Sequence, residues 1–313
     1  MKIDAAYILC AGLGTRMGQI GTVLPKPLWP LFEKTCLDFI IMQVQALGIT
    51  NIFINTHHLA GQIEEHVKSN KQTTINVLHE PILLGSGGAI HNLKRRFPEV
   101  KKVLVLNADF FFLLTPVTLR LALEKMQNAT SLLFCITVPF GSGLNQVCID
   151  NGLLKKIVQA SMIKPCISYE TYAGISILNL ETLEYQEGVS TFFDSVANFE
   201  NMNVPVFLDH GIEWYDVGTK QSYKAFYYEF SAKWPQGKRD VLSDTLIANG
   251  FLLPQKFSDS GSYSAFAGSK RVFNFDPDWN CLDPIPSDTF ILKAPSAPIV
   301  TSGIYFREYV DKN

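Results

Sequence analysis

Short apolar runs and amphipathic segments alternate through the first half of the chain. The apolar runs predict buried strands, and segments with apolar residues three and four positions apart predict helices. Strands are expected at residues 5–11, 51–55, 74–80, 101–109 and 131–140, with helices between them at 36–47, 60–69, 87–97 and 117–127. Because this order requires right-handed crossovers, it predicts an α/β fold with a Rossmann-like, mainly parallel sheet and helices on both faces.

The pattern changes after residue 140. Asn151-Gly152 separates two short apolar runs within residues 146–159, which predicts a β-hairpin. Further strands are expected at 172–180 and 203–209, and a helix at 219–234 that is closed by Pro235.

From about Gly237 onward, serine, proline and glycine become frequent and helical periodicity fades. Short strands are expected at residues 270–275, 288–294 and 303–309. We therefore expect a main domain at residues 1–236 and a small β-rich C-terminal appendage at 237–313. The appendage is rich in large apolar residues: Phe251, Phe266, Phe273, Phe275, Trp279, Phe290, Ile291, Tyr305 and Phe306. Left exposed, they would form a larger apolar patch than soluble monomers tolerate, so the appendage should pack on the main domain or on a second subunit.

Composition narrows the classes of protein. Hydrophobic residues make up 47% of the 313 residues, which argues against disorder. The formal net charge is -2 and no run of like charges is long enough to form a binding surface for a nucleic acid or a membrane, so neither is expected as a partner. The apolar start indicates a strand rather than a signal peptide. Six cysteines without a CxxC pair are typical of free thiols in a cytoplasmic protein.

The loop after the first strand, "LCAGLGTRMG", is the first candidate for chemistry. In an open parallel sheet, ligands bind beyond the carboxyl ends of the strands. Gly12 and Gly14 let the backbone approach an anion closely. The loop lacks the Gly-Lys-Ser/Thr of a Walker loop. Met17 stands where the dinucleotide fingerprint needs its third glycine, and "INTHH" offers no acid after the second strand, which excludes both better-known phosphate loops.

Two cations belong to the same region. Arg16 offers a planar fork for phosphate oxygens, and Lys26 offers a point charge. Pro25 and Pro27 restrain the backbone on both sides of Lys26, which would help to hold its side chain in a fixed direction. Together with the glycines, these residues predict a phosphate site.

Carboxylates follow two later strands. Asp109 comes after "KVLVLN", and Asp216 lies in "WYDVG". Two carboxylates with phosphate oxygens suit octahedral Mg²⁺, so we expect a magnesium site at Asp109 and Asp216. Asn107 shares a strand face with Asp109 and could orient a phosphate or a sugar hydroxyl.

Glu80 and Gly85 form a third candidate group. The Glu80 carboxylate could accept from an N–H on the edge of a base, and Gly85 lets the backbone reach other groups of that base. The glycines also open a helix whose N-terminus could help to hold a phosphate or a polar base edge. His57 and His58 are adjacent and point opposite ways if extended, so they cannot form a simple two-ligand metal site. His79 and His91 are expected to be structural.

These motifs, in order, resemble the sugar nucleotidyltransferases. The resemblance rests on "AGLGTRMG…LPKPLWPL", "NIFINTHHLAGQIEEHV", "HEPILLGSGGAIHNL", "LVLNAD", "YAGISIL" and "WYDVGTKQSYKAF", and covers about Ala5 to Phe230. It is strongest to bacterial members acting on mannose, heptose or N-acetylmuramic acid phosphates. It implies the nucleotide-diphospho-sugar transferase fold and a Mg²⁺-dependent transfer of a nucleoside monophosphate from a triphosphate to a sugar 1-phosphate. Such products serve the synthesis of cell-envelope polysaccharides.

The resemblance also implies residue roles. Arg16, Lys26 and Asp109 are expected to be catalytic, and Asp109 and Asp216 to bind the metal. The nucleotide is expected to contact Ala11, Gly12, Gly14, Thr15, Arg16, Glu80, Gly85 and Asn107. Tyr172 and Gly174 belong to "YAGISIL", the strand expected to lie beside the sugar, and are expected to help bind the sugar phosphate. Lys164, in "VQASMIKP", is a weaker sugar-phosphate candidate, because the Glu-Lys-Pro that often anchors the sugar phosphate is missing.

Several alternatives stay open on the sequence. A carboxylate at Glu80 slightly favours guanine as the base that is recognised. Acids occur at this position in uridylyltransferases too, so GTP and UTP both remain candidate substrates. A cytidylyltransferase for phosphocholine or a similar small phosphate, and a nucleotide-sugar binding protein without turnover, are the other candidates. A homodimer is also left open.

Overall fold

The computed structural model describes residues 2–69, 74–209, 212–233 and 240–256, with the short stretches 272–274, 289–292 and 306–308. The chain divides into two compact units. The first contains Met1–Gly12 and Ile40–Trp214, and the second contains Leu13–Phe39 and Tyr215–Asn313. The domain boundary expected after residue 236 stays a prediction, since most of residues 237–313 lie outside the described part of the chain.

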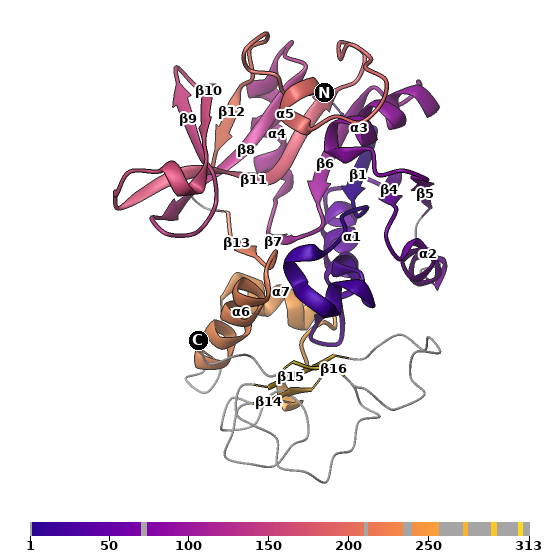
Figure 1. Cartoon of the computed structure of the whole chain (residues 1–313), viewed down its shortest axis with the longest axis vertical. Coiled ribbons are helices and arrows are strands. Elements are labelled where there is room, and N and C mark those ends of the chain that lie inside the picture. The colour runs from indigo at the N-terminus through magenta and orange to yellow at the C-terminus, as the bar shows by residue number, and fades with distance from the viewer. Residues whose placement is uncertain are drawn as a thin grey trace. The chain divides into compact units, whose positions relative to one another are not determined.

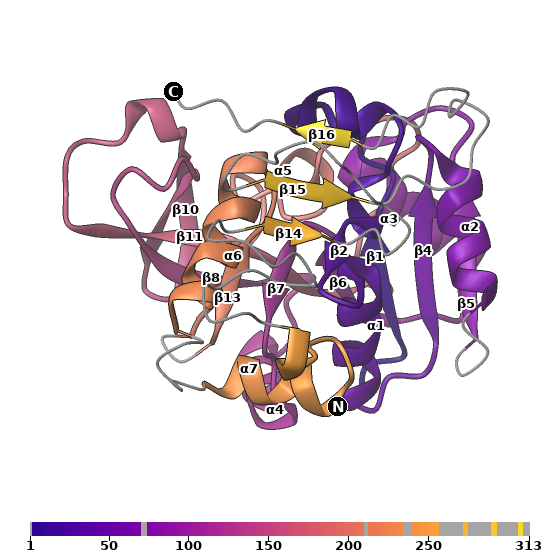
Figure 2. The same cartoon turned by 90° about the horizontal axis from the view of Figure 1, so that it is seen from below.

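A seven-stranded sheet forms the centre of the first unit. Its strands are β1 (Ala5–Leu9), β4 (Ile52–Thr56), β5 (Ile75–His79), β6 (Lys102–Asn107), β8 (Ser131–Pro139), β11 (Ser168–Asn179) and β12 (Val206–Leu208). They lie in the order β12-β8-β11-β6-β1-β4-β5, with β5 at one edge (Figure 2). All neighbours pair in parallel except β11, which runs antiparallel to both β6 and β8. The mainly parallel sheet expected from the sequence is confirmed.

Helices follow the strands as the pattern predicts. They are α1 (Cys36–Ala46), which spans the boundary between the units, α2 (Ala60–Ser69), α3 (Gly85–Arg96), α4 (Pro116–Met126) and the short α5 (Phe192–Ser195) (Figure 1). Tyr7 of β1 packs in one core cluster with Ile90 and Leu93 of α3. Ile8, which points to the opposite face of the sheet, is also fully buried. Both faces of the sheet are therefore covered, as expected. Within the described part of the chain, no helix has the length and apolar character needed to cross a membrane.

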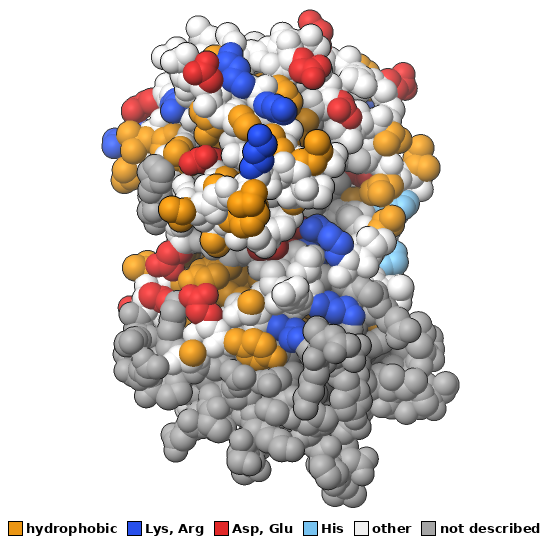
Figure 3. All heavy atoms as spheres, turned by 60° about the vertical axis from the view of Figure 1, so that its left-hand side comes forward, with side chains coloured by type: hydrophobic (Ala, Val, Ile, Leu, Met, Phe, Trp, Pro, Cys, Tyr) orange, Lys and Arg blue, Asp and Glu red, His pale blue; other side chains and the backbone are white. Residues whose placement is uncertain are grey.

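The remaining elements of the first unit are short. They are β7 (Phe110–Phe112), the hairpin of β9 (Gln146–Asp150) and β10 (Leu153–Val158), and η3 (Ala160–Met162). The hairpin turns at Asn151 and Gly152, whose φ angles of 51° and 75° fit the turn that Asn-Gly predicts. Figure 3 shows the face that carries this hairpin, where lysines, acids and apolar side chains are mixed.

The second unit gathers the Lys26 region and the C-terminal part of the chain. Its elements are η1 (Thr15–Thr22), η2 (Lys26–Leu28), β2 (Pro30–Leu31), β3 (Lys34–Thr35), α6 (Lys220–Lys233), α7 (Val241–Ala248) and η5 (Pro254–Lys256), then β14 (Val272–Asn274), β15 (Thr289–Leu292) and β16 (Phe306–Glu308). The strand β13 (Trp214–Asp216) spans the boundary. β15 pairs in parallel with β14 and antiparallel with β16, so the three strands expected in the tail are present.

Helix α7 was not expected from the sequence. Asp240 caps it by accepting a hydrogen bond from the Ser243 N–H at 2.8 Å, and Leu242 and Leu246 are buried. Eight residues are too few for a clear helical period, but a side-chain cap and buried leucines stabilise even two turns.

Candidate active site

The glycine-rich loop leaves the sheet beside the strand that carries Asn107. Leu9, the last residue of β1, pairs with Asn107, the last residue of β6. Asp109 follows two residues later, and its Oδ1 is buried. Burial raises the pKa of the Cys10 thiol, and the nearby charge of Asp109 raises it further. The structure thus brings Asp109 close to the residue that opens the loop.

Three strand ends are tied together by buried side chains. The Cys10 N–H donates to Asn55 Oδ1 at 2.7 Å, and Asn55 Nδ2 donates to Glu80 Oε1 at 2.8 Å. The Leu84 N–H donates to the other oxygen, Oε2, at 3.0 Å. Asn55 and Glu80 are 3% and 1% exposed. Glu80, expected to read a base, therefore has both carboxylate oxygens engaged by the protein.

His57 belongs to the same cluster. Its Nδ1 lies 2.8 Å from the Glu80 carbonyl oxygen, so Nδ1 carries the proton and donates it. The Glu80 N–H in turn donates to the Thr56 carbonyl at 2.8 Å. The imidazole thereby fixes the backbone where β5 ends.

The start of α3 is covered by a later segment of the chain. The N–H groups of Gly87 and Gly88 donate to the Ser190 carbonyl at 3.0 and 3.3 Å, and the Ser190 N–H donates to the Leu84 carbonyl. A Cβ at Gly85 would lie 2.5 Å from the Ser190 carbonyl oxygen, and one at Gly88 would lie 2.5 Å from that of Gly188. Close packing thus requires these glycines, and two of the N–H groups expected to meet a ligand are occupied by protein.

Gly174, a residue of the expected sugar strand, has a φ of 76°, and a Cβ there would lie 2.5 Å from the Phe110 ring. That ring stacks on Trp214 at 4.8 Å, and Trp214 Nε1 donates to the Ala173 carbonyl at 2.9 Å. Asn107 borders the same place, since its Cβ would lie 3.3 Å from the added atom. The aromatic pair beside Asn107 was missed from the sequence, although Phe110 directly follows "LNAD" and Trp214 is the first residue of "WYD".

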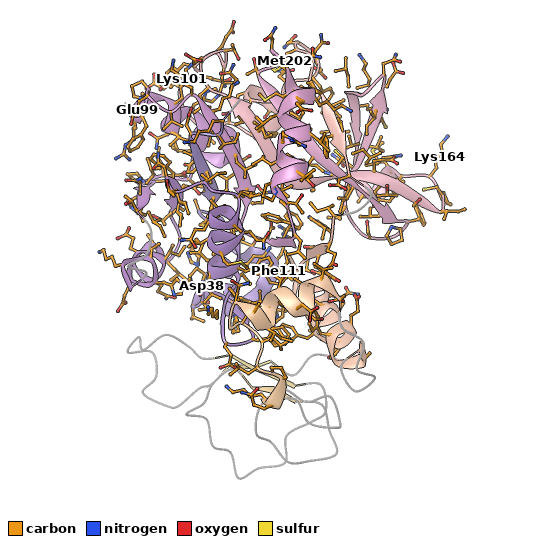
Figure 4. The ribbon with its side chains drawn as sticks, turned by 180° about the vertical axis from the view of Figure 1, so that it is seen from behind. Asp38, Glu99, Lys101, Phe111, Lys164 and Met202 are labelled. Atoms are coloured by element: carbon orange, nitrogen blue, oxygen red, sulfur yellow. The ribbon has the colours of Figure 1, made fainter. Side chains whose placement is uncertain are left out.

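The other two sugar-phosphate candidates differ in their surroundings. The Tyr172 ring stacks on Phe192 at 5.7 Å and packs against the core cluster. Lys164 is exposed in the loop between η3 and β11, where it points away from the ribbon (Figure 4). Burial raises the pKa of Tyr172 and the charge of Asp109 raises it further, so Tyr172 lies near Asp109 as well as in the core, whereas Lys164 is on an exposed loop.

In the second unit, the Lys26 turn rests on aromatic side chains of α6. Trp29 meets Tyr223 edge to face at 5.0 Å. The hydroxyls of Tyr223 and Tyr227 donate to the Pro30 carbonyl at 2.7 and 2.9 Å. The Tyr227 oxygen also accepts from the Phe32 N–H at 3.1 Å, and Phe32 holds a φ of 56°. This packing fixes the backbone on the C-terminal side of Lys26.

The charged candidates of the second unit lie on short segments. Lys26 is half-buried in η2, where the Trp29 N–H donates to its carbonyl at 3.0 Å. Arg16 is exposed at the start of η1. Asp216 is half-buried and accepts from the Gly218 N–H at 2.6 Å, just before α6. Of the other loop residues, Ala11 is buried, Gly12 and Thr15 are exposed, and Gly14 has a φ of 64°.

The two carboxylates expected to bind a metal belong to different units. Asp109 follows a buried strand of the first unit, and Asp216, in "WYD", belongs to the second. Oxygen ligands of this kind are those that Mg²⁺ prefers, with water and substrate phosphates completing its shell. Within the described residues, no cluster of three or more histidine, cysteine or acidic side chains that could hold a metal ion occurs.

Comparison with known proteins identifies the family. Residues 6–164, half of the chain, match the MobA-like NTP transferase domain, and the chain belongs to that family. It is 23% identical over 236 residues to a UTP–glucose-1-phosphate uridylyltransferase of Synechocystis sp., covering 70% of this chain and 61% of that protein. It is 36% identical over 111 residues to a D-glycero-α-D-manno-heptose 1-phosphate guanylyltransferase of Campylobacter jejuni, covering 34% of this chain and 48% of that one.

The chain thus spans about half to two thirds of these curated relatives. Both relatives are named as sugar-1-phosphate nucleotidyltransferases, and enzymes of this class generally depend on a divalent metal.

Solved structures agree on the fold. HddC from Yersinia pseudotuberculosis, complexed with GMP-PN, superposes with a TM-score of 0.63 at 20% identity, covering 73% of this chain and all of HddC. A UDP-glucose pyrophosphorylase complexed with UDP-glucose gives 0.59 at 17% identity, covering 73% of this chain and all of that one. The nucleotide-diphospho-sugar transferase fold expected from the sequence is confirmed.

Proposed function

We propose that the protein is a sugar-1-phosphate nucleotidyltransferase that uses Mg²⁺ and takes GTP or UTP. The glycine-rich loop starting beside Asn107 and Asp109, at the carboxyl ends of β1 and β6, carries this proposal. The guanylyltransferase and uridylyltransferase names of the relatives support it. Five free cysteines among the described residues, three of them buried, fit a cytoplasmic enzyme.

The chemistry needs little from the protein beyond position and charge. A phosphate oxygen of the sugar 1-phosphate attacks the α-phosphorus in line, the bond from that phosphorus to the bridging oxygen breaks, and pyrophosphate leaves. The attacking oxygen is already anionic, so no general base is required. In the proposal, Arg16 and Lys26 hold the phosphates, and Asp109 and Asp216 hold the metal. The bound metal would neutralise charge that develops on the phosphate oxygens.

The nucleotide contacts of the proposal are Ala11, Gly12, Gly14 and Thr15 in the loop, Gly85 in the base segment, and Asn107 at the end of β6. Gly174 is proposed to lie beside the sugar. A homodimer is a further proposal, and sedimentation of the full chain would test it.

The test is release of pyrophosphate. Purified protein with Mg²⁺ should release pyrophosphate from GTP or UTP with at least one member of a panel of hexose and heptose 1-phosphates. Pyrophosphate release from CTP with phosphocholine is measured in parallel, as the test of the cytidylyltransferase alternative. If no triphosphate and acceptor pair yields pyrophosphate, the proposed activity is wrong.

Residue variants sharpen the test. Lys26→Ala and Asp109→Asn should each lower kcat/KM by about 100-fold or more, because each removes a charge that stabilises the transition state. Thermal unfolding should stay close to that of the unchanged protein. Lys101→Ala is the matched control, since Lys101 is exposed at the opposite end of β6 and pairs there with Glu181 at 2.7 Å.

A further inference from the structure

A series of hydrogen bonds runs from Cys10 through Asn55 and Glu80 to Leu84. It joins two segments that, in the proposed function, both contact the nucleotide. Cys10 lies at the start of the glycine-rich loop expected to bind the phosphates. Leu84 precedes Gly85 in the segment expected to contact the base. We propose that Asn55 and Glu80 are positioning residues that hold these two segments in one fixed arrangement before the nucleotide binds. This inference rests on the proposed function.

Glu80 has the environment of a positioning residue. It is 1% exposed, and each of its carboxylate oxygens accepts a hydrogen bond from a protein N–H group. Its own N–H and carbonyl are bound by Thr56 and His57. Because the side chain is 1% exposed, it could reach a base only by turning outward, which would leave two buried donors without acceptors.

The residue types follow from the directions of the hydrogen bonds. Glu80 faces two donors, Asn55 Nδ2 and the Leu84 N–H, so it must offer two acceptors. Asn55 must accept from the Cys10 N–H and donate to Glu80, and only an amide does both at this length. A carboxylate at position 80 and an amide at position 55 are therefore explained without any ligand.

The expected effect is that the two loops lose less conformational entropy when the nucleotide binds. Two loops that close around a ligand lose conformational freedom, which weakens affinity unless they are already fixed. A shared buried pair fixes both loops at once. The role should appear in the KM for the triphosphate, with kcat little changed, because neither side chain touches the reacting atoms.

A swap of the two residue types tests this role. Glu80→Gln places an amide NH₂ against one of two donors, and Asn55→Asp places two carboxylates together. The double variant Asn55→Asp/Glu80→Gln rebuilds the chain of hydrogen bonds. Its new carboxylate at position 55 accepts from the Cys10 N–H and from the new amide NH₂ at position 80, and the oxygen of that amide accepts from the Leu84 N–H. The total charge is unchanged, and only the middle hydrogen bond reverses its direction.

The first readout needs no activity. Residue-resolved hydrogen–deuterium exchange of the apo protein should show at least tenfold faster exchange at the Cys10 and Leu84 amides in each single variant, and return to within about threefold in the double variant. Glu65→Gln, an exposed carboxylate of α2, is the matched control and should change neither amide. Unchanged exchange in both single variants would overturn the proposal. If Asn55→Asp does not fold, Glu80→Gln and the double variant still decide it.

The second readout is kinetic. KM for GTP or UTP should rise by about tenfold in Glu80→Gln, near the 1.4 kcal/mol of one hydrogen bond, and recover in the double variant. If the exchange recovers but KM stays high, holding the two segments does not govern affinity for the triphosphate, and the proposed role in nucleotide binding is wrong. If the unchanged protein neither binds nor turns over any triphosphate, the proposed function fails, and the exchange experiment still decides whether the pair holds the two loops.

Discussion

The two regions proposed to contact the triphosphate are held in contrasting ways. In the first unit, Cys10 and Leu84 are held by hydrogen bonds to the buried side chains of Asn55 and Glu80. In the second unit, aromatic residues of α6 hold the Lys26 turn: Trp29 packs on the Tyr223 ring, and the Tyr223 and Tyr227 hydroxyls donate to the Pro30 carbonyl. Hydrogen bonds fix the direction of single N–H groups, whereas packed rings fix the place of a whole segment. The first region should therefore be sensitive to residue chemistry, and the second to residue size.

The largest effect is expected where the second unit loses ring volume. Phe251 is 1% exposed, meets Phe39 edge to face at 5.7 Å, and its carbonyl accepts from the Glu33 N–H at 2.9 Å. Phe251→Ala should cost about 3–5 kcal/mol of unfolding free energy in denaturant titrations. Phe251→Leu, the size-conserving control, should cost clearly less. Equal losses in the two variants would contradict dependence on size.

Truncation after Trp234 extends this prediction. It removes Phe251 together with α7, so the remaining protein should be insoluble or much less stable. Soluble, equally stable and fully active truncated protein would show that the tail is an independent module. Phe266, Phe275, Trp279 and Tyr305 lie outside the described residues, and the structure describes only the backbone at Phe273, Phe290, Ile291 and Phe306, so the expected burial of these residues stays a prediction.

The second prediction concerns backbone packing in the first unit. Gly88→Ala should lower stability by about 1–3 kcal/mol, because the new Cβ meets the Gly188 carbonyl and must push the covering segment off α3. Gly61→Ala on α2 is the control, since nothing lies within 4 Å of its added atom. That change should be neutral or stabilising by up to about 1 kcal/mol, and chemical unfolding of both variants checks the difference.

The third prediction separates ring from hydroxyl at the Lys26 turn. Tyr227→Phe keeps the ring but leaves the Phe32 N–H without its acceptor, which should cost about 1–2 kcal/mol. The loss should be smaller than for Phe251→Ala, as expected of a region held by packing. Tyr185→Phe, at a side chain that is 46% exposed, is the control for hydroxyl removal. A loss as large as that of the ring deletion would place hydrogen bonding above packing here.

The smallest effect is a pH dependence from His91. Burial lowers the pKa of His91, whose Nδ1 accepts from the Gln186 N–H at 3.3 Å. The folded state therefore favours the neutral His91 ring. This contribution to stability is present above the pKa of His91 in the unfolded chain, about 6.5, and is lost as pH falls through the lower pKa of His91 in the folded protein. The melting temperature should fall less between pH 7 and pH 5 in His91→Gln than in the unchanged protein. Parallel curves would rule out this role.

The layered fold was predictable because alternating strand and helix patterns leave few topologies. Elements that depend on distant contacts were not. The strand β7 has three residues, too few for a period, and α7 depends on its Asp240 cap and on buried leucines. The antiparallel direction of β11 within the sheet cannot be read from its own residues.

The candidate site shows the same division. The loop glycines, Lys26 and Asp109 are marked by local motifs, and the family they indicated is confirmed. Asn55 was missed, because a buried amide is recognised only when its partners on neighbouring strands are known. The base contact expected of Glu80 stays a prediction. Its hydrogen bonds to Asn55 and Leu84 could not be foreseen, because a carboxylate at a strand end looks alike in sequence whether a ligand or the protein supplies its donors.

The bond from the Tyr227 hydroxyl to the Pro30 carbonyl links residues 197 positions apart, and this separation has a consequence during synthesis. At about 5–20 residues per second, α6 leaves the ribosome roughly 10–40 s after the Lys26 segment. Until then the segment has none of the α6 rings that support it, so a nascent chain with a formed central sheet should not yet hold a triphosphate firmly. Proteolysis of ribosome-stalled chains should cut beside Lys26 until α6 has emerged and become slow afterwards.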